Sequence, residues 1–249
     1  MEINIPKSST VFSALLRADF TTQWRNRRSA VLALLIPVII LISWKGIIVK
    51  YGGAFVLSSS IALGLVAIGL MGYTNSVARD RDKGIFQRLR VAPIPSWAIM
   101  ISRLTVQLTM ILIVTICVFI TGYYVDGIHL SAVGYLLTVI SALVGGAVYL
   151  SLGQMIVGLI KNPETVNSTT RLVYFVFIIT GMIGGLGFLG DIAQKLARWS
   201  PYGTVQTMLA GSLQPDLWHN ETTMALLVTL GYTLFFAFMG IKKFKWNTR

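Results

Sequence analysis

Few side chains in this sequence are of the types that perform catalysis. Asp126 and His129 share a short predicted loop, and their carboxylate and imidazole groups are both metal-ligand types. Two ligands do not make a metal site, so we interpret this pair as part of a solvated loop. Ser151 lies in the run Tyr149-Leu-Ser151-Leu-Gly153, which lacks the first glycine of the Gly-x-Ser-x-Gly turn that presents a nucleophilic serine. We therefore predict a packing role for Ser151.

The composition indicates an integral membrane protein. Hydrophobic residues make up 55% of the 249 positions and charged residues only 12%, compared with about 25% charged residues in a soluble domain. The formal net charge of +12 does not indicate nucleic-acid binding, because the Lys and Arg residues cluster at the ends of apolar runs, where they orient membrane spans. The single cysteine, Cys117, excludes an intrachain disulfide. We expect no cleaved signal peptide, since a polar and amphipathic segment precedes the first apolar run.

The predicted fold class is an all-α integral membrane protein with six transmembrane helices. A span needs ~20 predominantly apolar residues, and the segments that qualify or nearly qualify are 29–49, 53–77, 99–122, 132–160, 172–190 and 222–241. Of the 21 Lys and Arg residues, 17 lie on one side of this layout, counting Arg103 at the start of the third span. Because positive charge accumulates on the cytoplasmic side, we expect both termini and the loop after the second span to be cytoplasmic. Lys45, near the outer end of the first span, is interpreted as an interfacial anchor.

Three domains follow from this layout, namely a cytoplasmic interfacial helix in 1–28, the six-span transmembrane domain in 29–241 and a cytoplasmic tail in 242–249. In 11–24 the apolar residues fall largely on one helical face, which Asp19 and Gln23 interrupt, so this helix should lie along the membrane interface. The glycine-rich run 180–190 predicts a broken or re-entrant tip of the fifth span. Residues 191–221 are too polar for a full span and predict an outer re-entrant helical hairpin.

A basic stretch at 78–93, inside the predicted cytoplasmic loop 78–98, provides a surface for a soluble partner. Ile85, Phe86 and Leu89 are apolar anchors for a groove, and Gly84 permits a bend between the charged and the apolar parts. The complementary charge comes from Arg79, Arg81, Lys83, Arg88 and Arg90. A loop that only set the topology would need neither the apolar anchors nor the interleaved Asp80 and Asp82.

Several functions are disfavoured by what the sequence lacks. No acidic residue or histidine falls inside the six predicted spans, which disfavours ion-coupled transport and intramembrane acid-base catalysis. The sequence contains no Gly-x-x-x-x-Gly-Lys-Ser/Thr run, so a nucleotide-driven step must occur on another polypeptide. Two alternatives stay open: a secondary transporter or channel without an ATPase, and a polytopic membrane enzyme.

The stretch from Ala78 onward resembles a segment of type 2 ABC exporter permeases. That segment has an acidic-arginine-acidic element, a glycine, an apolar-x-Arg-Leu core, a proline and a basic residue that opens the next span. The corresponding positions here are Asp80-Arg81-Asp82, Gly84, Arg88-Leu89, Pro93 and Arg103. The family often has Glu where this chain has Asp80 and Asp82. Residues 196–211 resemble the outer segment before the last span of these permeases, with Pro201 at the usual proline.

The resemblance implies the transmembrane subunit of an ATP-binding cassette exporter, a non-enzymatic chain without cofactor or metal of its own. The partners would be cytoplasmic ABC ATPase subunits carrying ATP and Mg, and a second permease copy or related permease, in a prokaryotic plasma membrane. The ATPase-coupling residues would be Arg79, Asp80, Arg81, Asp82, Lys83, Gly84, Ile85, Phe86, Arg88, Leu89 and Arg90. Neutral polar groups of the spans, Asn75, Gln154, Tyr174 and Thr180, would line the pathway. They suit an amphipathic or lipophilic cargo such as a drug, an antibiotic or a lipid-like molecule, and hence a role in antibiotic resistance.

Overall fold

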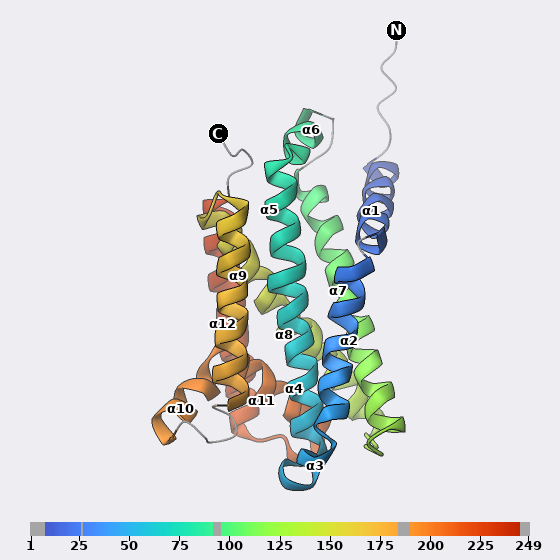
Figure 1. Ribbon diagram of the computed structural model, residues 1–249, viewed down its shortest axis with the longest axis vertical. Coiled ribbons are helices and arrows are strands. Elements are labelled where there is room, and N and C mark those ends of the chain that lie inside the picture. The colour runs from blue at the N-terminus through green and yellow to red at the C-terminus, as the bar shows by residue number, and fades with distance from the viewer. Residues whose placement is uncertain (1–7, 26, 92–95, 184–189, 245–249) are drawn as a thin grey trace.

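The computed structural model of the chain describes residues 8–25, 27–91, 96–183 and 190–244 (Figure 1). Every regular element in these residues is a helix, which confirms the all-α prediction. The α-helices are α1 (Ser8–Arg25), α2 (Arg27–Ser43), α3 (Lys45–Tyr51), α4 (Gly53–Val66), α5 (Asn75–Asp82), α6 (Ile85–Val91), α7 (Ser96–Tyr124), α8 (Ala132–Leu159), α9 (Pro163–Ile178), α10 (Asp191–Trp199), α11 (Pro201–Leu213) and α12 (Asn220–Lys243). Two π-helical stretches, η1 (Ala67–Thr74) and η2 (Ile179–Ile183), and the 3-10 turn η3 (Pro215–Leu217) complete the described elements.

Four described helices are long and apolar enough to cross a membrane. They are the continuous helix Gly53–Asp82, formed by α4, η1 and α5, together with Trp97–Tyr124, Ala132–Leu159 and Asn220–Lys243. They match the second, third, fourth and sixth predicted spans. The main difference is that the helix begun at Gly53 continues to Asp82 instead of ending at Val77. The start of the predicted cytoplasmic loop is therefore helical.

The first and fifth predicted spans differ from simple membrane helices. The first is a bent pair, Ala33–Ser43 and Lys45–Tyr51, whose axes meet at 63° around Trp44. If this pair crosses the membrane as one span, the described residues contain five candidate spans. The fifth predicted span appears as α9 and η2, which begin early because Asn162 caps a helix whose first residue is Pro163. The predicted re-entrant tip lies mostly in 184–189, outside the described residues.

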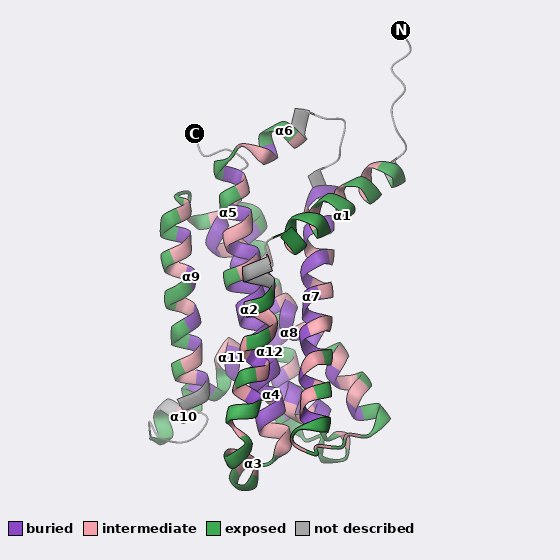
Figure 2. Cartoon of the chain, turned by 45° about the vertical axis from the view of Figure 1, so that its right-hand side comes forward, coloured by how far each residue is buried: buried purple, intermediate pink, exposed green. Residues whose placement is uncertain are grey.

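The helix from Gly53 to Asp82 forms the centre of the bundle. Val56 to Leu70 are buried without interruption, and Figure 2 shows that α7 and α8 also present many buried residues. A helix that is apolar on all sides is stabilised by packing neighbours around its whole circumference. Within the chain, α2, α7, α8 and α11 pack directly against α4.

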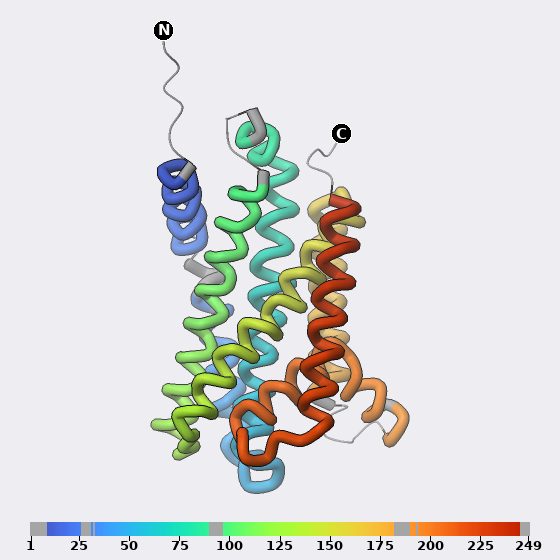
Figure 3. The backbone as a smooth tube through the Cα atoms, turned by 180° about the vertical axis from the view of Figure 1, so that it is seen from behind, coloured from blue at the N-terminus to red at the C-terminus, as the bar shows by residue number. Residues whose placement is uncertain are grey.

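The central helix and α8 approach each other closely through two glycines. A Cβ on Gly69 would lie 2.5 Å from Cβ of Tyr149, and a Cβ on Gly153 would lie 2.1 Å from Oγ1 of Thr74. The first contact is at the π-helical stretch η1, where Thr74 Oγ1 donates a hydrogen bond to the Gly69 carbonyl five residues earlier. Figure 3 shows α8 crossing the back of the bundle obliquely toward the upper end of α12. Small residues at such crossings let membrane helices pack at short range.

The two ends of the bundle carry different short helices. The helices α1 and α6 and the end of α12 lie at one end, while α3, α10 and α11 lie at the other (Figure 1). The predicted interfacial helix is α1, which packs against α7 and leaves Trp24 63% exposed. The predicted outer hairpin is α10 and α11. Its second helix is buried against α4, α8 and α12, and its first exposes Ile192 and Leu196.

Candidate functional site

The charged segment predicted to bind a partner forms a helical elbow, which we define as residues 79–91. The central helix ends at Asp82, the chain turns at Gly84, and α6 follows. Gly84 has a φ of +67° and its amide donates to the Arg81 carbonyl at 3.1 Å. A side chain here would be strained because L-residues rarely adopt positive φ, although the space around it is open. The bend expected at Gly84 is therefore present.

Arg81 lies inside the chain. It is 1% exposed, and its guanidinium donates three hydrogen bonds to backbone carbonyls at the end of α8. Nη1 reaches the Val157 oxygen at 2.6 Å, and Nη2 reaches the oxygens of Ile160 and Lys161 at 2.7 and 2.8 Å. The last carbonyls of a helix have no partner within the helix, and the negative end of the helix dipole favours a cation. Arg81 thus caps α8 from a different helix.

Phe86 is the second elbow residue that points into the chain. It is 0% exposed, its ring meets that of Phe244 edge to face at 6.0 Å between centroids, and Arg103 lies over it with its guanidinium carbon 4.7 Å from the ring centroid. A cation over a desolvated aromatic face is worth ~2 kcal/mol. The phenyl ring therefore fastens α6 to the bundle, instead of projecting toward a partner as an anchor would.

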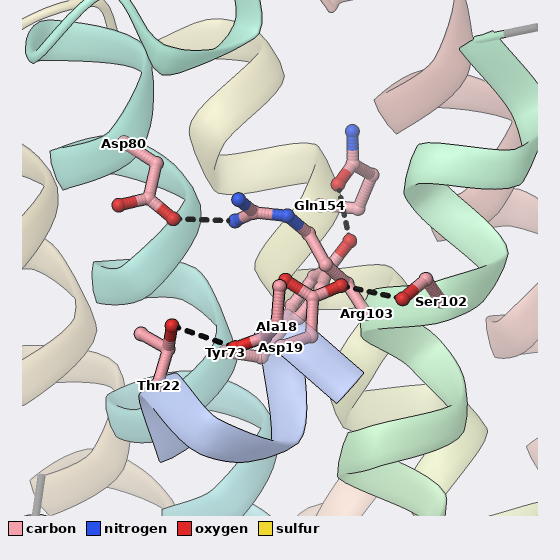
Figure 4. Close-up of polar contacts among 8 residues, drawn as sticks. All are labelled: Ala18, Asp19, Thr22, Tyr73, Asp80, Ser102, Arg103 and Gln154. Carbon is pink, nitrogen blue, oxygen red and sulfur yellow. Dashed lines mark hydrogen bonds and ion pairs between the residues drawn. The ribbon is translucent and has the colours of Figure 1, made fainter. Parts of the chain in front are cut away.

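Asp80 and Asp19 extend this cluster across three helices (Figure 4). Oδ2 of Asp80 on the central helix lies 2.7 Å from Nη1 of Arg103 on α7. Ser102, the residue directly before Arg103, donates a hydrogen bond of 2.6 Å from its Oγ to Oδ2 of Asp19 on α1. Burial raises the pKa of the Asp19 carboxyl, and the Ser102 hydrogen bond and Arg103 oppose that shift. The elbow, α7 and the interfacial helix are thus joined by polar side chains.

The other residues predicted to couple to the ATPase differ in how far their side chains are exposed. Arg79, Asp82, Lys83 and Arg88 are exposed, while Ile85 and Leu89 are half-buried, with Leu89 packed against the core. The side chain of Arg90 lies outside the described residues, as does Pro93. The exposed members form a charged surface on the outside of the elbow. The buried members attach the elbow to the bundle.

The four predicted pathway residues do not form one cluster. The Gln154 Oε1 accepts a 2.8 Å hydrogen bond from the Tyr73 hydroxyl (Figure 4), and Asn75 lies against α9, where Thr170 Oγ1 donates to its Oδ1 at 3.4 Å. Tyr174 is buried at 9% exposure. Thr180 donates to the Val176 carbonyl of its own helix at 2.6 Å. The structure thus places Asn75 at the contact with α9 and Gln154 in the contact between the central helix and α8.

A cavity of about 260 Å³ lies at the opposite end of the bundle, between α4, η2, α10 and α11. Its lining combines apolar groups such as Phe55 and Ala210 with one charged side chain, Arg198, and with the neutral polar side chains of Ser58, Gln194, Gln206 and Thr207. Gln206 Nε2 donates a 2.6 Å hydrogen bond to Ser59 Oγ. Such a mixed lining suits an amphipathic molecule better than a small ion.

The catalytic and metal candidates of the sequence do not assemble into sites in the described part of the chain. The hydroxyl of Ser151 donates to the carbonyls of Ala147 and Val148 in its own helix, which fits a packing role. The ring of His129 packs edge to face on Tyr123. Among the described residues, no group of three or more His, Cys, Asp and Glu side chains is placed to hold a metal.

The partners of Asp19 and Arg103 were not apparent from the sequence, although both residues left a signal. Asp19 interrupts the apolar face of an amphipathic helix, and Arg103 lies at the start of an apolar run. A charge in apolar surroundings needs a partner. Such a signal indicates that a partner exists without identifying it.

One comparison with known proteins identifies a family. The family model described as ABC-2 type transporter matches residues 10–214. The match extends from α1 through the central bundle to the end of α11 and includes the whole elbow. No curated protein matches the sequence.

Proposed function

Because the chain belongs to the ABC-2 type transporter family, we propose that its elbow docks a cytoplasmic ATPase that drives export through the bundle. The family makes the chain a multi-pass, non-catalytic membrane permease domain that binds no cofactor itself. Such permeases generally pair with ABC ATPase subunits. The proposal extends to ATP and Mg on that partner and to a second permease copy, identical or related, beside this one.

The observation that carries the proposal is the division of the elbow into an exposed and a buried side. Arg79, Lys83 and Arg88 are exposed, whereas Arg81 and Phe86 tie the same short segment to α8, α7 and the end of α12. A docking element transmits force only if it is attached firmly to what it moves. A loop whose only role was to orient the membrane spans would need no such attachment.

The proposed orientation places both termini and the elbow in the cytoplasm of a prokaryotic cell. It is supported by the charge distribution of the sequence and by the position of α1, α6 and the end of α12 at one end of the bundle (Figure 1). The proposed boundaries remain 1–28, 29–241 and 242–249, with 191–221 on the outer side. Six spans result if the bent pair and α9 each cross the membrane.

We propose that α9 faces the pathway or the second copy. Its exposed residues are polar near its start, at Thr165, Ser168 and Arg171, and apolar further along, at Leu172, Phe175 and Val176. The polar part of this surface is costly against lipid but stable against water or protein, and the apolar part can pack against a second copy. Among the four predicted pathway residues, Thr180 and Tyr174 lie on this helical segment, and Asn75 contacts it through Thr170. Gln154 is retained as a pathway residue in the proposal.

The proposed cargo is amphipathic or lipophilic, such as a drug, an antibiotic or a lipid-like molecule, and export of an antibiotic would confer resistance. The mixed lining of the 260 Å³ cavity supports this class. A secondary transporter or channel, the alternative, requires no ATPase. It would therefore have no partner to move the elbow, and the firm attachment of the elbow to the bundle would have no function. The alternative of a membrane enzyme is excluded by the family.

Charge reversal on the exposed side of the elbow tests the proposal. Arg79→Glu combined with Arg88→Glu should lower retention of the ATPase during purification by about tenfold or more, because like charges across an interface repel. Arg198→Glu, an exposed arginine at the opposite end, is the control and should retain the partner. Unchanged retention in the double variant would refute docking at this surface. Phe86 is unsuitable for this test because its replacement would disturb the fold.

A further inference from the structure

Arg81 occupies a position that docking does not explain. It belongs to the charged elbow, yet it is 1% exposed and all three of its hydrogen bonds go to backbone carbonyls between Val157 and Lys161. Neither of the two ion pairs found among the described residues includes it. A guanidinium held this way cannot supply charge to a partner, so its role must be sought inside the chain.

The carbonyls that Arg81 holds belong to the junction between α8 and α9. The helix α8 ends at Leu159, Ile160 is extended, and Asn162 caps α9 by accepting hydrogen bonds from the amides of Glu164 and Thr165 at 2.8 and 3.3 Å. Only Ile160 and Lys161 separate the end of one helix from the cap of the next. Arg81 therefore grips the point where α8 passes into α9.

The path from the elbow to this junction is continuous and stiff. Arg81 lies in the last turn of α5, directly before the bend at Gly84, so a displacement of α6 acts on it through less than one helical turn. Three charge-assisted hydrogen bonds in a planar fork fix both distance and direction, which a single ammonium group would not do. Phe86 holds the other side of the same bend against Phe244.

We propose that Arg81 is the positioning residue that passes movement of the elbow to the junction of α8 and α9. This inference rests on the proposed function, since it assumes that an ATPase moves the elbow. Arg81 then does not contact the ATPase. Instead, it connects the elbow to α8 and α9 within the chain. The consequence is that α9, the helix that begins at this junction, moves when the elbow moves.

Hydrogen-deuterium exchange on the intact permease–ATPase complex tests the inference. Exchange is compared without nucleotide and in the state trapped with Mg-ATP and vanadate, for peptides covering the elbow (79–91) and the junction (158–168). In the wild type, both peptides should change on trapping. In Arg81→Met the elbow should still change, while the nucleotide-dependent change at the junction should shrink by roughly tenfold or more, because the variant removes all three charge-assisted hydrogen bonds to the junction.

Two further variants make the result specific. Arg81→Lys keeps the charge but not the fork, so it should preserve part of the junction response, and it replaces Arg81→Met if the latter does not fold. Arg17→Met removes an exposed arginine from α1 and should leave both responses unchanged. The ATPase should copurify with all three variants, because none alters the exposed side of the elbow.

The outcomes separate the inference from the proposed function. A junction that still responds fully in the Arg81 variants, or that never responds in a wild type whose elbow does, overturns the role of Arg81 and leaves ATPase docking intact. If no ATPase accompanies the wild type, the proposed function fails and the inference fails with it.

Discussion

Asp80 and Arg103 form an ion pair across two helices, with 2.7 Å between Oδ2 and Nη1 and side-chain exposures of only 16% and 10%. The same guanidinium lies over the ring of Phe86, so one arginine on α7 holds both sides of the elbow bend. Arg81 adds the end of α8 to this arrangement. The elbow is thus fastened to three neighbouring elements before any partner binds.

The first prediction concerns the Asp80–Arg103 pair. Asp80→Asn should lower the free energy of unfolding by about 1.5–3 kcal/mol, because it weakens a shielded charge-assisted hydrogen bond. The matched control is Glu221→Gln, which breaks an exposed pair with Arg198 at 3.2 Å and should have no measurable effect. Thermal unfolding in detergent measures both. Equal losses in the two variants would contradict the assignment of Asp80.

A second prediction concerns pH. Because burial raises the pKa of Asp19 above its ordinary value of 3.8, the folded state binds the proton more tightly than the unfolded state. The stability contributed by the protonated carboxyl is therefore present at acid pH and is lost as pH rises through the raised pKa. Asp19→Asn removes this titration while its carbonyl still accepts from Ser102. Exchange protection of α1 should fall between pH 4 and neutrality in the wild type by more than in the variant, and parallel profiles would refute this.

A third prediction tests the close contact between the central helix and α8. Gly69→Ala places a Cβ 2.5 Å from Cβ of Tyr149 and 2.7 Å from its backbone carbon, so it should destabilise the fold by about 1–3 kcal/mol. Gly231→Ala on α12 meets nothing within 4 Å and should be neutral or stabilising by at most about 1 kcal/mol. The comparison is made by thermal unfolding. A neutral Gly69→Ala would show that the two helices are separable here.

Orientation gives a fourth prediction. In a Cys117→Ser background, a cysteine at exposed Lys83 should react with a membrane-impermeant maleimide only in inside-out vesicles, and a cysteine at exposed His129 only in right-side-out vesicles. The expected sidedness follows from the excess of positive charge at the elbow end. The reverse pattern would overturn the proposed topology.

Much of the bundle was predictable from the sequence because uninterrupted apolar runs determine membrane helices. The predicted spans 99–122, 132–160 and 222–241 lie within a few residues of α7, α8 and α12. The bend at Trp44 was missed, since Lys45, the charge directly after it, was interpreted as an interfacial anchor at the end of one continuous span. The end of the central helix was placed too early because a change from apolar to charged residues does not stop a helix. Between Val77 and Gly84 the sequence contains no glycine or proline that would end the helix.

The bend at Gly84 was predicted from the sequence, but which elbow residues contact the rest of the chain was not. Phe86 and Arg81 were interpreted as contacts for a partner, and in the structure both contact the chain itself. The partners of Arg81 are backbone carbonyls 76 to 80 residues away, and backbone groups leave no trace in side-chain composition. Asp19 and Arg103 were visible as charges in apolar surroundings. The partner of Asp19 depends on how α1 packs against α7, and the partner of Arg103 depends on how the central helix packs against α7.

Purification of the wild-type chain from native membranes in a mild detergent tests the central claim most directly. The account predicts that a P-loop ATPase accompanies the chain in near-stoichiometric amount, and that the pair binds and hydrolyses ATP while the isolated chain does not. The account is contradicted if the chain purifies without such a partner and transports solute in sealed vesicles that contain no ATP-hydrolysing protein.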